Sequence, residues 1–181
     1  LAVQAALGMA ERIPELNRHW QERAEAAGQL FTPVRIGIGI NTGNCCVGNL
    51  GSTQRFDYSA IGDEVNLAAR LEGLSKLYGV TAIMSERTAE RMKDIRVIEL
   101  DVVRVKGRAR PTRIYTPLAL VGVEQSEELA SLQAEFLAAY RAQNWDSAKS
   151  VMERTRTLLA ALGTAELDSY YGLFASRIAA Y

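Results

Sequence analysis

One short run, VRIGIGIN at residues 34–41, constrains the fold of this chain more than any other feature. Valine and isoleucine alternate there with arginine and glycine, which is the period-two pattern of a β-strand. Gly37 and Gly39 leave one face of that strand without side chains, so another group can approach its backbone closely. A ligand, another chain or a helix packed over the sheet would each explain the glycines, and spacing alone leaves the choice open.

The residues that follow predict a β-hairpin. Asn41–Asn44 has the composition of a turn, and Cys45–Leu50 is expected to return as the second strand. Because neighbours in a strand point to opposite faces, one of the two adjacent cysteines is expected in the core and the other opposite. Two cysteines and a single histidine predict neither a disulfide framework nor a metal cluster, and they fit a reducing compartment.

The remaining pattern up to Leu118 predicts an α+β fold, with a mostly antiparallel sheet and helices on one side. Leu67, Leu71, Leu74 and Tyr78 recur at helical spacing and form a core face, with Asp63 as the candidate N-cap and Gly79 as the terminator. The expected elements around that helix are helices at 1–27 and 86–93, an extended piece ending near 59, and strands at 81–84, 95–105 and 113–118.

The pattern changes after Val121, where only helical spacing remains. Three helices are expected, with Asn144 capping the second, and the first two resemble a tetratricopeptide-type hairpin. We therefore divide the chain into residues 1–121 and a helical extension at 122–181. One such hairpin cannot bury its own apolar face, so the extension is expected to pack on the first part, a partner or further repeats, and a packing or dimer-associated role is favoured.

Composition and charge limit the classes of molecule that this chain is expected to bind. The chain has 181 residues, 48% of them hydrophobic, and its 21 basic residues equal its 21 acidic ones, which argues against broad nucleic-acid binding. No apolar run reaches the roughly 18 residues of a membrane span. The sequence opens at Leu1 inside a helical pattern, so it is expected to be part of a longer protein. The expected location is cytoplasmic, with any membrane attachment supplied by upstream segments.

Asn66 and Arg70 are the first candidates for chemistry. They lie four residues apart and therefore project from one face of the predicted helix. A solvated or capping polar face would explain them equally well. However, helix N-termini favour anions, an arginine fork suits phosphate oxygens, and an amide suits a sugar hydroxyl. A second basic cluster, VKGRAR, contains Lys106, Arg108 and Arg110, and is either a solvated hairpin tip or a clamp on a polyphosphate.

Four segments in order resemble the class III nucleotidyl cyclase catalytic domain, the adenylate and guanylate cyclase family. They are RIGIGINTGNCCVGNLGS, RFDYSAIGDEVNLAARLEGLSK, MSERT and VRVKGRARPTRIYTPL. The resemblance covers about 34–118 and implies a ferredoxin-like cyclase fold that lacks its first strands here. It also implies conversion of a nucleoside triphosphate to a 3′,5′-cyclic nucleotide and pyrophosphate by a head-to-tail homodimer with active sites at its interface.

The resemblance assigns roles residue by residue. It places Asn66 against the ribose, Arg70 on the charge that develops at the phosphate, and Arg108 on the terminal phosphates, with Lys106 as a weaker candidate. The position that helps to select the base is Ser59, whose hydroxyl resembles the threonine type and favours ATP. A serine bonded to its own turn is the alternative.

The resemblance also implies Mg²⁺ or Mn²⁺, held by two aspartates on segments upstream of this sequence together with a base-contacting lysine. No aspartate in this chain occupies those motifs, so we expect this chain to contribute no metal ligand. We therefore also expect the chain by itself to be inactive. The leading interpretation is therefore an adenylate cyclase, a phosphorus–oxygen lyase of bacterial signal transduction. The alternatives are a non-catalytic, nucleotide-binding regulatory module and a guanylate cyclase.

Overall fold

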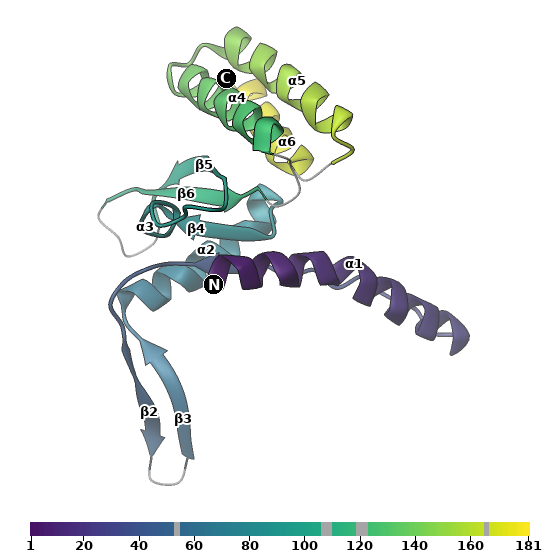
Figure 1. The fold of residues 1–181 in the computed structure, drawn as a ribbon, viewed down its shortest axis with the longest axis vertical. Coiled ribbons are helices and arrows are strands. Elements are labelled where there is room, and N and C mark those ends of the chain that lie inside the picture. The colour runs from purple at the N-terminus through teal and green to yellow at the C-terminus, as the bar shows by residue number, and fades with distance from the viewer. Residues whose placement is uncertain (53–54, 106–109, 119–122, 165–166) are drawn as a thin grey trace.

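The computed structural model describes residues 1–52, 55–105, 110–118, 123–164 and 167–181 (Figure 1). The elements in chain order are α1 (Ala2–Ala26), β1 (Ile38–Ile40), β2 (Cys46–Ser52), β3 (Arg55–Ile61), α2 (Asp63–Tyr78), β4 (Ala82–Ser85), α3 (Glu86–Ala89), β5 (Val97–Val103), β6 (Thr112–Pro117), α4 (Val123–Arg141), α5 (Trp145–Ala161) and α6 (Asp168–Ala179). The predicted α+β class is confirmed, and the first strand and the helix after β4 are shorter than expected.

The main sheet has the strand order β1-β4-β6-β5, in which β1 and β4 run parallel and the other pairs are antiparallel. Helix α2 packs on β1 and β4. A Cβ added to Gly39 would collide with the backbone of Ala68 and Glu72, and one added to Gly37 would collide with Ser75. The bare face of the first strand therefore accommodates a helix, which settles the choice that the alternation left open.

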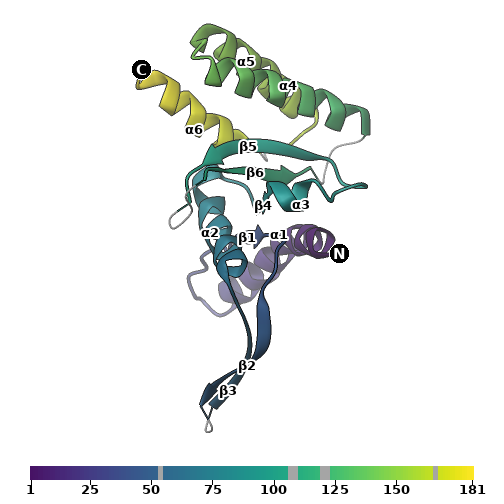
Figure 2. The same ribbon diagram turned by 90° about the vertical axis from the view of Figure 1, so that its left-hand side faces the viewer.

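The predicted hairpin between β1 and β2 is wrong. Strand β2 pairs antiparallel with β3, from Cys46 opposite Ile61 to Ser52 opposite Arg55, whereas β1 pairs with β4. The β2–β3 ribbon projects away from the rest of the molecule in both views (Figures 1 and 2). Cys45 and Cys46 are both exposed, contrary to the alternation argument, because among the described residues no helix or further strand forms a layer over either face of the ribbon (Figures 1 and 2).

Alternate residues of the main sheet face two different cores. Ile83 and Ile114 join Leu67 and Leu71 of α2 in the larger core, while the adjacent Met84 and Tyr115 face Val3 of α1 and Ala89 of α3. The second face of the sheet is thus also covered in part, by the first turns of α1. The rest of α1 extends beyond the sheet (Figure 1).

Helices α4, α5 and α6 lie over β5 (Figures 1 and 2) and share the larger core with the sheet. The buried Gln133 of α4 donates from Nε2 to the Glu99 carbonyl (2.7 Å) and to the Tyr170 hydroxyl (2.6 Å). Its Oε1 accepts from the Tyr171 hydroxyl (2.7 Å), and Tyr170 in turn donates to the Leu100 carbonyl (2.7 Å). The extension was expected to pack on the first part of the chain, on a partner or on further repeats. In the structure it packs on the first part of the chain. The predicted cap of α5 is also present, since Asn144 accepts from the Ser147 amide (3.2 Å).

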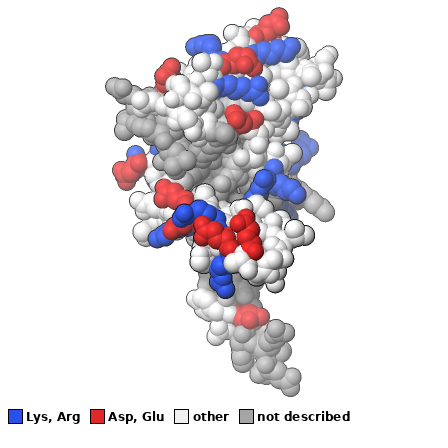
Figure 3. Space-filling view, turned by 90° about the vertical axis from the view of Figure 1, so that its right-hand side faces the viewer, with Lys and Arg blue, Asp and Glu red and all other residues white. Residues whose placement is uncertain are grey.

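The surface carries both signs of charge, interspersed over the face viewed in Figure 3. This mixture agrees with the equal numbers of acidic and basic residues in the sequence. Among the helices of the described ranges, none has the length and apolar character needed to cross a membrane.

Candidate functional site

Helix α2 carries the central candidates. It begins after Gly62, whose φ of 145° lies in the region that favours glycine, and it ends at Gly79 in the left-handed conformation. Asp63 is the first helical residue rather than the N-cap, and no side chain caps the helix start. An acidic Asp63 in the first turn still suits the helix dipole.

The structure places Asn66 and Arg70 on one side of α2, beside the buried Leu67 and Leu71. The Asn66 side chain is exposed and that of Arg70 is half-buried. Within the part of the chain that the structure describes, neither side chain forms a hydrogen bond or an ion pair. An arginine fork and an amide that are held on a packed helix, with their polar atoms unused, are suited to receive an anionic or hydroxylated ligand.

Of the other predicted site residues, the structure describes Ser59 but not Lys106 or Arg108. Ser59 lies on β3, where its backbone is opposite Gly48, and is half-buried. Strand β3 leads directly into α2 through Ile61 and Gly62, so Ser59 is connected to the Asn66 face by a short, ordered segment. Lys106 and Arg108 lie outside the described residues.

A polar cluster that sequence reasoning treated only as a turn secures the start of α2. Asn41 donates from Nδ2 to the Glu64 carbonyl (2.9 Å) and to Glu64 Oε2 (2.6 Å), and its Oδ1 accepts from the Ser85 hydroxyl (2.5 Å). Thr42 and Thr88 share a further hydrogen bond (2.9 Å). The only signal for this cluster in the sequence is an asparagine directly after a strand, so its partners could not be identified.

The comparisons with known proteins decide the family. The profile of the adenylate and guanylate cyclase catalytic domain matches residues 1–117. This chain belongs to that cyclase family. Its similarity to individual cyclases is moderate, and the chain spans less than a quarter of the length of either curated relative described next.

Adenylate cyclase 1 of Rhizobium meliloti (strain 1021) is 33% identical over 128 residues, which cover 70% of this chain and 18% of the relative. An adenylate cyclase of Anabaena cylindrica is 34% identical over 120 residues, which cover 63% of this chain and 23% of the relative. The crystal structure of the guanylyl cyclase Cya2 matches at a TM-score of 0.53 and 33% identity, covering 67% of this chain and 58% of that structure.

The described residues of this cyclase domain do not fit a divalent-cation site, because no three histidine, cysteine, aspartate or glutamate side chains among them come together in a suitable group. Asp57, Asp63 and Asp94 are exposed. Asp101 accepts a hydrogen bond from the Tyr78 hydroxyl and forms an ion pair with Arg177. Among the described residues, none of these four aspartates belongs to a group of three such side chains.

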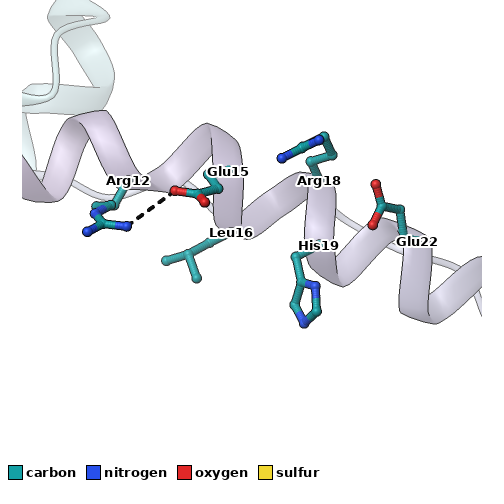
Figure 4. Close-up of a pocket in the computed structure, with 6 residues that line it drawn as sticks. All are labelled: Arg12, Glu15, Leu16, Arg18, His19 and Glu22. Atoms are coloured by element: carbon teal, nitrogen blue, oxygen red, sulfur yellow. Dashed lines mark hydrogen bonds and ion pairs between the residues drawn. The ribbon is translucent and has the colours of Figure 1, made fainter.

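A shallow hollow on α1 is separate from the α2 face. Six side chains of that single helix line it: Arg12, Glu15, Leu16, Arg18, His19 and Glu22 (Figure 4). Arg12 and Glu15 form an ion pair at one end of it (3.3 Å). The hollow shares no residue with the Asn66 and Arg70 side of this cyclase domain, and its mixed charges indicate no particular ligand.

Proposed function

We propose that this chain supplies the Asn66 and Arg70 half of an adenylate cyclase active site, which converts ATP to 3′,5′-cyclic AMP and pyrophosphate. One observation carries the proposal. Asn66 and Arg70 stand on one side of a helix anchored by Leu67 and Leu71, and their polar groups have no partner among the described residues. In a member of the cyclase family, such unused groups are best explained as contacts to the substrate.

The chemistry requires little beyond placement and charge. The ribose 3′-oxygen forms a bond to the α-phosphorus, the bond from that phosphorus to the oxygen bridging to the β-phosphate breaks, and pyrophosphate leaves while the 3′-hydroxyl proton passes to solvent. In this proposal Asn66 hydrogen-bonds the ribose and holds the 3′-oxygen in line. Arg70 stabilises the negative charge that develops on the phosphate oxygens, which is the principal contribution a protein makes to phosphoryl transfer.

Further contacts complete the proposed half-site. Ser59 meets the adenine edge, Arg108 contacts the terminal phosphates, and Lys106 is the weaker candidate for that role. Mg²⁺ or Mn²⁺ belongs to the proposal as well, and the family resemblance leads us to propose that its aspartate ligands lie on segments upstream of this sequence. We propose that two copies of the full protein pair head to tail to complete each site, and that the 181-residue chain alone is inactive.

The test uses the full-length protein that contains this chain, assayed with ATP and Mn²⁺. Arg70→Ala is expected to lower turnover about 100-fold or more, since removal of one group that stabilises transition-state charge has effects of that size. Lys76→Ala is the matched control, because it removes an exposed charge from the same helix. An Arg70→Ala protein with unchanged turnover would overturn the role given to Arg70.

GTP is the second candidate substrate, since the Cya2 structure that this chain resembles is that of a guanylyl cyclase. Parallel assays with ATP and GTP distinguish the two candidates, and faster turnover of GTP would replace ATP in the proposal. Nucleotide binding without turnover of either substrate would favour a non-catalytic regulatory module.

A further inference from the structure

The far end of α2 is tied to the C-terminal helices through one carboxylate. Tyr78, the last residue of α2, donates its hydroxyl hydrogen to Asp101 Oδ2 on β5 (2.7 Å). Arg177 of α6 donates from Nη1 to the same oxygen (2.8 Å). Three elements distant in sequence thus meet at one atom.

These three groups are well shielded from water. Tyr78 as a residue is 1% exposed, and the side chains of Asp101 and Arg177 are 17% and 31% exposed. The Arg177 guanidinium also lies over the rings of Phe174 (4.7 Å) and Tyr78 (5.7 Å). Charge-assisted bonds in such surroundings are stronger and less screened than surface ion pairs, so loss of the guanidinium leaves a half-buried carboxylate with a weaker set of partners.

A second contact closes the same junction. Gly79 has a φ of 67°, and a Cβ at that position would collide with the side chain of Ser169 at the start of α6. The rings of Tyr78 and Tyr170 are also neighbours, with centroids 6.3 Å apart. Helix α6 therefore fits directly against the C-terminal turn of α2.

Position is transmitted along α2 because a packed helix moves as a rigid rod. Arg70 and Tyr78 are eight residues apart, about 12 Å along the axis. The glycine face of β1 restrains the middle of the rod, and Asn41 restrains its start. The junction with Asp101 and Arg177 is the restraint at its end.

We propose that Arg177 is a positioning residue for α2, acting through Asp101 and Tyr78, so that helices α4–α6 help to set the orientation of Asn66 and Arg70. This inference rests on the proposed function for its catalytic consequence, but its structural part stands on the contacts alone. The helical extension is then a component of the cyclase site rather than an appendage that packs beside it.

The test compares Arg177→Met, Arg177→Lys and Arg154→Met in the full-length protein. Methionine keeps an unbranched apolar stem and removes the charge, while lysine restores a charge near Asp101. Arg154→Met is the matched control, since it breaks an exposed ion pair to Glu135 within the helical extension (3.2 Å) without reaching α2.

Hydrogen–deuterium exchange of the free protein is the first readout. The amides of Gly79 and Val80, both bonded to the Ser75 carbonyl, report on the end of α2. We expect exchange there to accelerate about tenfold in Arg177→Met, to recover in part in Arg177→Lys, and to stay unchanged in Arg154→Met. Unchanged exchange in Arg177→Met would overturn the proposal, whatever the enzyme assays give.

Steady-state kinetics are the second readout. A misplaced catalytic group slows the chemical step, so kcat should fall about tenfold in Arg177→Met with KM within about twofold of the parent, and lysine should rescue part of it. Faster exchange with unchanged kcat, in a protein whose turnover Arg70→Ala lowers about 100-fold or more, would show a purely structural contact and overturn the positioning role. A wild-type protein without turnover would instead overturn the proposed function, and faster exchange would still support the contact between α6 and α2.

Discussion

The side-chain amide of Asn41 holds Glu64 at two points, its backbone carbonyl and its carboxylate, at 2.9 Å and 2.6 Å. Asn41, the residue that follows β1, thereby fixes the first turn of α2 at Glu64, which lies two residues before Asn66. The Ser85 hydroxyl completes the arrangement by donating to the other side of the same amide. The orientation of the candidate site therefore depends on a residue that contacts no substrate in the proposed reaction.

Replacing Asn41 with alanine should destabilise the fold and disturb the site together. The substitution removes two hydrogen bonds to the half-buried Glu64 and one from the buried Ser85, so the free energy of unfolding should fall by about 2 kcal/mol. Urea unfolding followed by circular dichroism measures this change. The control is Asn49→Ala on the exposed β2–β3 ribbon, and equal midpoints for the two variants would contradict the role given to Asn41.

Gly39→Ala tests the close contact between β1 and α2. The new methyl group would overlap the backbone of Ala68 and Glu72, and a helix backbone cannot move aside as a side chain can. Overpacking of this kind should lower the free energy of unfolding by about 3 kcal/mol and shift Arg70 enough to reduce turnover.

The matched control for that variant is Gly73→Ala, on α2 itself. A Cβ at Gly73 meets nothing within 4 Å, and alanine is the better helix former by about 1 kcal/mol. Gly73→Ala should therefore raise the urea midpoint while Gly39→Ala lowers it. Two variants that shift the midpoint in the same direction would show that the glycine face is not a packing requirement.

The sequence pattern was sufficient to predict those elements whose structure depends on the spacing of nearby residues. The period of Leu67, Leu71 and Tyr78 predicted both α2 and its buried face, and Gly79 marked its end. Pairing of strands was predicted wrongly because it depends on partners distant in sequence: β1 pairs with β4, across the whole of α2. Alternation identified the first strand but contains no information about which strand it joins.

The candidate site also has one part that local spacing predicts and another that depends on residues distant in sequence. Helical spacing is enough to place Asn66 and Arg70 on one side of α2, because that relation is set by the helix itself. The groups that hold the helix in place could not be predicted, since Asn41 is 23 residues from Glu64 and Arg177 is 76 residues from Asp101. Only the fold brings such residues together.

Alkaline pH provides a further test of how closely the C-terminal helices are joined to the sheet. Burial raises the pKa of Tyr78, Tyr170 and Tyr171 above the ordinary value near 10, and for Tyr78 the hydrogen bond to Asp101 adds to the effect. Below pH 10 the folded and unfolded chains both retain these phenol protons, so stability does not depend on them. Above pH 10 the unfolded chain releases protons that the folded chain keeps, and the free energy of unfolding falls by up to about 1.4 kcal/mol per pH unit for each tyrosine.

The expected result is a chain that keeps its stability up to about pH 10 and loses it steeply above that value, with tyrosinate absorbance rising together with the loss of helical circular dichroism. Tyr78→Phe removes one of the three groups, so it should make the decline of stability between pH 10 and 12 shallower, whatever its effect at neutral pH. Tyr58→Phe, at an exposed position on β3, should leave the slope unchanged. A slope that Tyr78→Phe does not alter would mean that this phenol reaches water in the folded chain, and that the junction of α2, β5 and α6 opens before the rest of the core.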